Sequence, residues 1–182
     1  MPASRHALAL LLLLLLGATR AHGAVDLYEA VLWGDLETVE RALDEEPSRI
    51  RTRFEGGGSL LHLAVQGNEP EMVQLLLDRG ADLDARAGKG LTPLHFAAGN
   101  GRTDFVLALV FAGARVDPVD EDGQTPLHRA IRMRAESVIR ALVYNGASLR
   151  VRDRRGRTPL DLALLVGPEE VVRFLRQEEA AP

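Results

Sequence analysis

Three histidines are the side chains of this sequence best suited to acid–base or metal chemistry, because imidazole titrates near neutral pH and binds zinc. His62, His95 and His128 are spaced 33 residues apart, and each ends a similar four-residue motif. A zinc site needs ligands that converge on one point. Residues at one position of successive units would instead be spread along a stack, so we expect no metal site and no bound cofactor.

The remaining candidates for catalysis are weak. The four serines after the N-terminal segment, Ser48, Ser59, Ser137 and Ser148, lie in no Gly-x-Ser-x-Gly elbow. The acidic pairs Glu45–Glu46 and Glu178–Glu179 lack surroundings that would bury them and separate their pKa values, so we expect solvated charge at helix ends. We predict that the protein is not an enzyme.

Two glycine-rich stretches could suggest a phosphate-binding loop. Residues 56–58 read Gly-Gly-Gly and residues 88–90 read Gly-Lys-Gly. Both lack the spacing and the Lys-Ser/Thr pair of a phosphate loop, and neither follows a strand. We predict that both are hairpin turns between repeated units.

Composition further limits the class of protein to which this chain can belong. The chain has 182 residues, 46% of them hydrophobic, a formal net charge of −4 and no cysteine. This length suits one domain with a sizeable core. Without cysteine there is no disulfide, thiolate nucleophile or Cys-ligated metal. The acidic balance argues against a nucleic-acid-binding protein, whose footprint is basic.

The first 23 residues resemble a secretory signal peptide. Arg5 precedes an apolar run from Ala7 to Leu16, and small residues follow near Ala21 and Gly23, where cleavage is expected. As a helix this run would reach about 15 Å, half of a hydrocarbon layer of about 30 Å. We therefore expect export through a Sec-type pathway and no membrane association after cleavage. The destination would be the periplasm in a diderm bacterium and the exterior or a secretory compartment otherwise.

A 33-residue repeat organises the rest of the chain. The motif begins at Ser59, Thr92, Thr125 and Thr158, and reads Ser-Leu-Leu-His, then Thr-Pro-Leu-His twice, then Thr-Pro-Leu-Asp. A second signature, Gly-Ala, recurs with the same period at residues 80–81, 113–114 and 146–147. Fixed self-similarity of this kind predicts a stack of small units.

Each unit is predicted to contain two short antiparallel helices and a turn. Thr at the helix entrance can cap free amide groups, and Pro at the next position needs no hydrogen-bond partner for its nitrogen. A second helix carries apolar residues at helical spacing, as at Phe105, Val106, Leu109 and Val110. The Gly of each Gly-Ala pair suits a left-handed helix end.

These features resemble ankyrin repeats, and with the predicted leader the chain is similar to ankyrin-repeat proteins of the bacterial periplasm. The resemblance implies an all-α solenoid of about five helix-turn-helix units over residues 24–179, followed by a flexible tail at 180–182. The expected units are residues 24–53, 54–86, 87–119, 120–152 and 153–179, the first and last acting as caps. The sequence departs from the family pattern at Leu60, Asn68, Arg134 and Asp161, where local helix geometry could differ.

The resemblance also assigns roles to residues. It implies that the motif histidine is structural and hydrogen-bonds the turn. The expected structural motif residues are Ser59, His62, Thr92, Pro93, His95, Thr125, Pro126, His128, Thr158 and Pro159.

The resemblance further implies a concave partner-binding surface made by turn tips and first helices. Mapped onto this chain, that surface contains Glu55, Gln66, Lys89, Leu91, Asn100, Glu121, Asp122, Gln124, Arg132, Met133, Arg154, Arg155 and Arg157. Residues 24–128 carry a net charge of −10 and residues 129–182 a net charge of +4. Such a division would orient a charged partner, although the arginines could equally serve solubility alone.

We predict a monomeric module that binds another protein and no nucleic acid, since no aromatic residues interleave the arginines. An alternative is an inhibitor or immunity-type protein that silences an exported enzyme, with its acidic residues filling a basic cleft.

Overall fold

The fold is a row of stacked helical pairs. The computed structural model describes residues 27–180; residues 1–26, which include the predicted leader, and residues 181–182 lie outside the described part. Helices and short 3-10 turns make up the regular structure of residues 27–180, which contain no β-strand. The predicted all-α class is confirmed.

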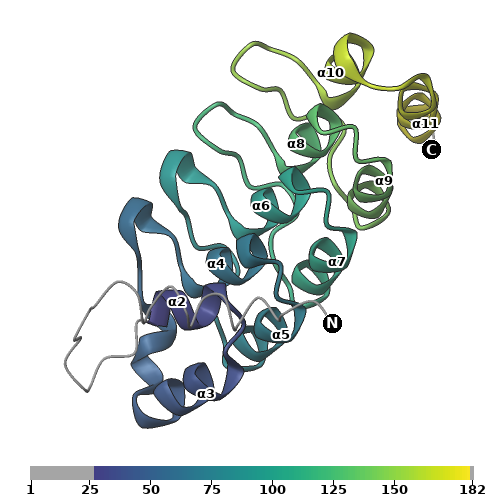
Figure 1. The fold of residues 1–182 in the computed structure, drawn as a ribbon. Helices are drawn as coiled ribbons and strands as arrows, with labels where there is room; N and C mark the ends of the chain where they lie inside the picture. The colour runs from purple at the N-terminus through teal and green to yellow at the C-terminus, as the bar shows by residue number, and fades with distance from the viewer. Residues whose placement is uncertain (1–26, 181–182) are drawn as a thin grey trace, which may run out of the picture.

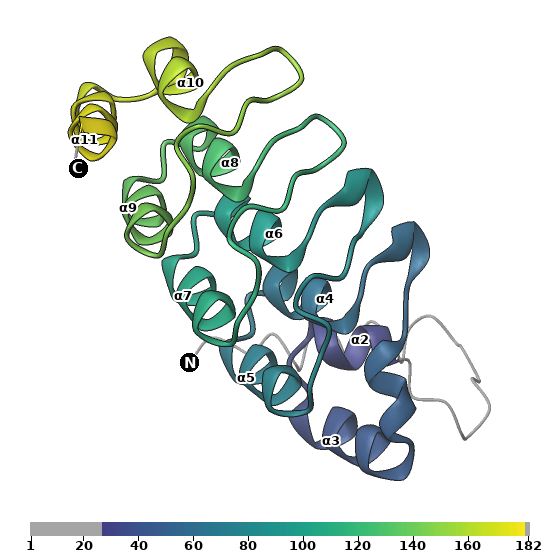
Figure 2. The same ribbon diagram turned by 180° about the vertical axis from the view of Figure 1, so that it is seen from behind.

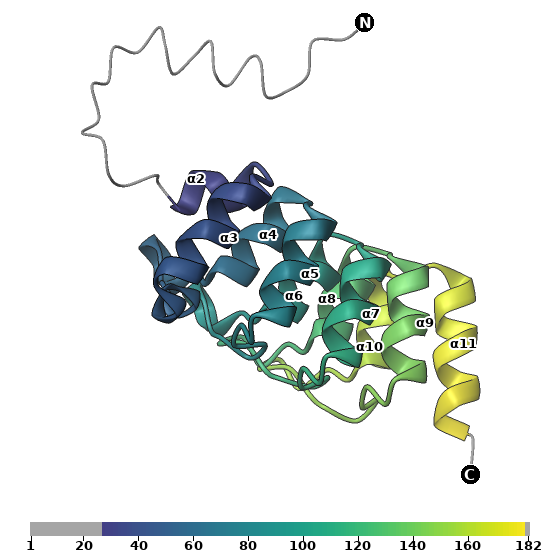
Figure 3. The same ribbon diagram turned by 90° about the horizontal axis from the view of Figure 1, so that it is seen from below.

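Two parallel rows of helices run along the molecule. The inner row contains α2 (Leu27–Leu32), α4 (Leu60–Gly67), α6 (Pro93–Gly99), α8 (Pro126–Arg132) and α10 (Pro159–Val166). The outer row contains α3 (Leu36–Glu45), α5 (Pro70–Asp78), α7 (Thr103–Phe111), α9 (Glu136–Tyr144) and α11 (Glu169–Ala180). Loops project from the inner row, away from the outer row (Figures 1 and 2). Figure 3 shows the outer helices side by side from α3 to α11.

The inner helices begin where the motif predicts. Thr92, Thr125 and Thr158 are the N-cap residues of α6, α8 and α10, and a proline follows each of them. The departure at Leu60 does not alter this arrangement, because Ser59 caps α4 in the same way. At Asp161 a carboxylate accepts the Thr158 amide at 2.9 Å, and thus caps the helix as the histidines do elsewhere.

Glycines end the outer helices as predicted. Gly80, Gly113 and Gly146 have φ angles of 74°, 101° and 87°. The amide that follows each glycine reaches back five residues, as in Ala114 N–H to Leu109 O at 3.0 Å. This is the hydrogen bond of a left-handed helix end.

At two positions where the family pattern has glycine, this chain has another residue that adopts the backbone conformation of glycine. Asn68 and Arg134 stand after α4 and α8 with φ angles of 65° and 56°, close to the 69° of Gly101 after α6. Side chains with a Cβ rarely adopt this conformation, and asparagine tolerates it better than most residues. The helix pairs therefore keep the same linkage at all three positions.

Each unit completes the core of the unit before it. Val65, Ala98 and Ile131 occupy one position in successive inner helices and are at most 1% exposed. The equivalent residue in α10, Leu164, is 54% exposed because no described unit stacks on it. Burial at this position thus depends on the next unit, as expected for a solenoid.

The projecting loops are hairpins, and we call their ends the hairpin tips: residues 54–58, 87–91, 120–124 and 153–157. In each tip the first amide donates to the last carbonyl, as in Asp120 N–H to Gln124 O at 3.0 Å. Two of these tips contain the glycine-rich stretches, so their prediction as turns is confirmed. Neighbouring tips are also joined, since Glu121 N–H donates to Lys89 O and Arg154 N–H to Asp122 O, each at 2.9 Å.

Candidate partner-binding groove

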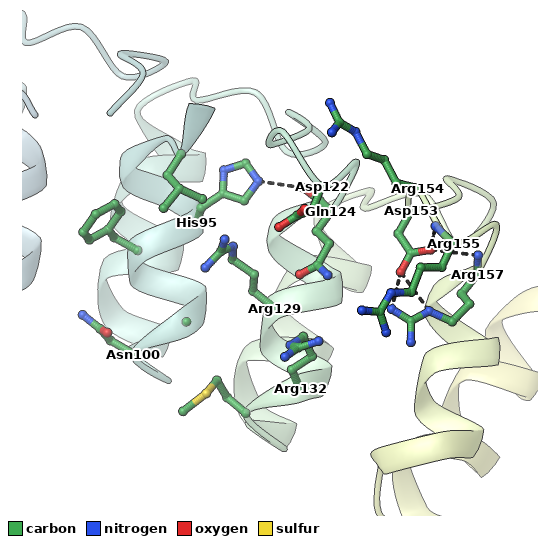
Figure 4. A pocket seen from close by; sticks show the side chains of 14 residues that line it. His95, Asn100, Asp122, Gln124, Arg129, Arg132, Asp153, Arg154, Arg155 and Arg157 are labelled. Carbon is green, nitrogen blue, oxygen red and sulfur yellow. Dashed lines mark hydrogen bonds and ion pairs between the residues drawn. The ribbon is translucent and has the colours of Figure 1, made fainter. Parts of the chain in front are cut away.

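A groove lies between the inner helices and the hairpin tips of the C-terminal half. It encloses about 500 Å³ and is bounded by α6, α8 and the hairpin tips 120–124 and 153–157 (Figure 4). Its lining residues are Leu91, His95, Phe96, Gly99, Asn100, Asp122, Gln124, Arg129, Arg132, Met133, Asp153, Arg154, Arg155 and Arg157. The groove is an open surface feature shared by three successive units.

Most of the predicted partner-binding residues meet in this groove. Nine of them line it: Leu91, Asn100, Asp122, Gln124, Arg132, Met133, Arg154, Arg155 and Arg157. The other four, Glu55, Gln66, Lys89 and Glu121, are exposed but lie outside the lining. Glu55 and Gln66 belong to the second unit, which contributes no residue to the lining.

Sequence reasoning missed Phe96 and Arg129, which also line the groove. Both directly follow a motif histidine, at a position where α4 carries a buried leucine, Leu63. Phe96 and Arg129 are each partly exposed. The equivalent residue in α10, Leu162, is again buried. Comparing this one position across units would have been the signal that the two middle units differ from the others.

The motif histidines join successive units. His95 accepts the Thr92 amide through Nδ1 at 3.1 Å and donates from Nε2 to Gln124 O at 3.0 Å in the next hairpin tip. His62 and His128 repeat this arrangement, reaching Leu91 O at 3.0 Å and Arg157 O at 3.2 Å. Because both ring nitrogens are engaged, none of the three rings offers a free nitrogen to a substrate or a metal ion.

Burial keeps these rings neutral. Desolvation lowers the pKa of His95 from 6.5 to about 4, although its bond to the Gln124 carbonyl acts in the opposite direction. Desolvation lowers the pKa of His62 and His128 too. A neutral ring with Nε2 protonated is the form that the hydrogen bonds require.

A buried aspartate organises each of the last two hairpin tips. Asp120 accepts the amides of Asp122 and Gln124 and pairs with the Arg129 guanidinium at 2.8 Å. Asp153 likewise accepts the amides of Arg155 and Arg157 and pairs with the Arg157 guanidinium at 2.6 Å.

Burial by itself raises the pKa of both aspartates. Hydrogen bonds from the paired arginine and the tip amides outweigh burial, so the pKa of each carboxyl lies below its ordinary value. Arg129 and Arg157 line the groove, but the charge of each is already neutralised by a buried aspartate of a hairpin tip. We assign Arg157 to the hairpin, although the sequence placed it among the partner contacts.

Three other arginines in the groove keep their charge available. The guanidinium groups of Arg132, Arg154 and Arg155 form no hydrogen bond or ion pair with the described residues, and all three residues are exposed. Arg132 projects from α8, while Arg154 and Arg155 come from the hairpin tip before α10 (Figure 4). Met133 lies beside Arg132 and is 59% exposed.

Residues 27–180 were also compared with what a metal site and a membrane-spanning helix require. Nowhere in this range do three His, Asp or Glu side chains gather as a metal ion would require. No helix in the same range is long and apolar enough to cross a membrane.

Comparison with known families agrees with the geometry. A model described as ankyrin repeats matches three overlapping stretches, residues 27–120, 61–153 and 110–182. The chain belongs to the ankyrin-repeat family. No curated protein matches the ankyrin-repeat chain. Ankyrin repeats are generally protein–protein interaction modules, and the structure provides this chain with a groove on the face where such modules present their hairpins.

Proposed function

We propose that this ankyrin-repeat chain binds another protein in the groove bounded by α6, α8 and the last two hairpin tips, and that it is not catalytic. The observation that carries the proposal is the presence of exposed Met133 beside unpaired Arg132, Arg154 and Arg155. Exposed apolar side chains and unpaired guanidinium groups in one concavity are typical of residues that dominate binding at interfaces.

The groove is held in place before any partner arrives. Its tips are hydrogen-bonded to each other, and the buried carboxylates of Asp120 and Asp153, paired with Arg129 and Arg157, fix the shape of each tip. Binding to such a surface loses little backbone conformational entropy on the side of the repeat protein. This rigidity supports recognition of a partner segment by a preformed surface.

The absence of catalysis is supported by the state of the histidines. Each of His62, His95 and His128 uses both ring nitrogens within the fold and has a lowered pKa. A general base needs an accessible nitrogen within reach of its substrate. These three rings therefore serve as connectors between units.

Site-specific photo-crosslinking tests the proposal. A photoreactive amino acid in place of Met133 should crosslink the partner in the native compartment, whereas the same group in place of Phe111 should not. Phe111 is a matched control because it is 76% exposed but lies on α7 in the outer row. Equal crosslinking at both positions, or crosslinking at Phe111 alone, would show that the partner does not use the groove.

We also propose that the chain is exported and meets its partner as a monomer outside the cytoplasm. The support is the predicted leader at residues 1–23. N-terminal sequencing of the protein recovered from the exported fraction should begin at His22 or Ala24. Sedimentation of the mature chain should give the mass of a single copy, and a cytoplasmic, uncleaved protein would contradict the export proposal.

A further inference from the structure

We infer that the groove selects a partner segment in which carboxylate side chains stand next to an apolar side chain. This inference rests on the proposed function and specifies the chemistry of the partner. The segment's carboxylates would bind Arg132, Arg154 and Arg155, and its apolar residue would pack on Met133.

Some arginines that line the groove form ion pairs within the fold, whereas others are free to bind a carboxylate of a partner. Five arginines line the groove, and two of them already hold buried carboxylates, Asp120 and Asp153. The remaining three, Arg132, Arg154 and Arg155, have no anionic partner among residues 27–180. Charge-assisted hydrogen bonds from guanidinium to carboxylate are among the strongest polar contacts in proteins, so an acidic segment is the complementary ligand.

The pattern of the hairpin tips localises this preference. The positions held by Arg154 and Arg155 are occupied by Glu55 and Gly56, then Gly88 and Lys89, then Glu121 and Asp122 in the earlier tips. Only the last of these four tips presents two arginines. An acidic segment would therefore be directed to the C-terminal end of the groove.

Apolar side chains also line the groove. Met133 is largely exposed, and Leu91 and Phe96 are partly exposed along the same lining. Methionine adapts to apolar side chains of different shapes. A segment with an apolar residue beside its carboxylates would use both features at once.

The neighbouring tip argues against a nucleic acid. Asp122 lines the groove, Glu121 is exposed beside it, and the Asp122 carbonyl accepts the Arg154 amide at 2.9 Å. A uniformly charged phosphate backbone that contacted Arg154 and Arg155 would run alongside these two carboxylates. A peptide can place its negative charge on one side only, so it suits the alternating charge of adjacent tips.

Three blocked, fluorescein-labelled peptides test the inference with the mature chain. The first is Gly-Glu-Glu-Leu-Glu-Glu-Leu-Gly, the second replaces each Glu by Gln, and the third replaces each Leu by Ser. Fluorescence anisotropy should show the first peptide binding at least about tenfold more tightly than either of the others. Its affinity should fall as salt rises from about 50 to about 300 mM, because the contacts are partly exposed.

Matched charge variants locate the site. The variant R132A/R154A/R155A should bind the first peptide at least about tenfold more weakly, while R41A/R115A/R150A stays within about twofold of the wild type. Arg41, Arg115 and Arg150 are also exposed, lie outside the groove and have free guanidinium groups. Since none of the six guanidinium groups forms a hydrogen bond or an ion pair with the described residues, urea unfolding should change little in either variant.

Three results would overturn the inference: equal binding of the Gln peptide, an equal loss in both triple variants, or tighter binding of a ten-nucleotide oligothymidine than of the first peptide. Partner crosslinking at Met133 separates the two proposals. If crosslinking persists while the acidic peptide fails to bind, the groove binds a protein of other chemistry. If crosslinking at Met133 also fails, the proposed function is wrong as well.

Discussion

Replacement of His95 by glutamine should weaken the dependence of stability on pH. The pKa of His95 is about 4 in the folded chain and 6.5 as the reference value for the unfolded chain. A lowered pKa means that the unfolded state takes up a proton first as the pH falls. The contribution of neutral His95 is therefore complete above about pH 6.5 and is lost progressively towards about pH 4.

The size of the effect follows from these two values. At pH 5 the histidine is almost fully protonated in the unfolded chain and still mostly neutral in the folded chain. The free energy of unfolding should accordingly fall by about 2 kcal/mol between pH 7.5 and pH 5 because of His95 alone. Asp120 and Asp153 have pKa values below the ordinary 3.8, so their contributions decline only at lower pH.

Glutamine is the informative replacement. It cannot titrate in this range, and at the third helical position after Thr92 it can complete a capping box in place of the histidine. At pH 7.5 the variant should be less stable by about 1 to 2 kcal/mol, because the bond to Gln124 O is lost.

Urea unfolding at pH 7.5 and pH 5 provides the assay. The wild type should lose about 2 kcal/mol more than His95→Gln between the two pH values. His62 and His128 titrate equally in both proteins and cancel in the comparison. An identical loss in the two proteins would refute the conclusion that burial holds His95 neutral.

Three further changes test how units are joined and how hairpins are held, each measured by urea unfolding at pH 7.5. Ile131→Ala should cost about 2 to 4 kcal/mol, whereas Leu164→Ala at the equivalent uncovered position should cost less than about 1 kcal/mol; equal costs would contradict stacking of units. Asn68→Val should cost about 1 to 2 kcal/mol because a β-branched residue resists a positive φ, while Asn68→Gly should be tolerated. Arg157→Ala should cost about 2 kcal/mol, since it leaves the buried carboxylate of Asp153 without its cation; an unchanged stability would return Arg157 to the partner-binding set.

Much of the fold could be predicted because its determinants are local. Thr125 and Pro126 start a helix through capping and a fixed φ angle, and Gly146 ends the next one through a left-handed conformation. These effects act within a few residues, so the 33-residue period transmits them to every unit. The departure at Asn68 was harmless for the same reason, as asparagine can adopt the conformation of the missing glycine.

The candidate site was predicted only in part, because it depends on which charges the fold neutralises. Nothing in the sequence distinguishes Arg157 from its neighbours Arg154 and Arg155. In the structure, only Arg157 forms an ion pair with the buried carboxylate of Asp153. That pairing arises when the hairpin closes and brings residues four apart together. The extent of the groove was also unpredictable, since the exposure of Phe96 depends on side chains from neighbouring units.

Amide hydrogen exchange on the chain with and without its crosslink-identified partner tests the central claim most directly. We predict slower exchange in the partner-bound state at hairpin tips 120–124 and 153–157 and at the end of α8, with no change in α7 and α9. Slower exchange confined to the outer helices α7, α9 and α11 would contradict the account, because the partner would then bind the face opposite the groove.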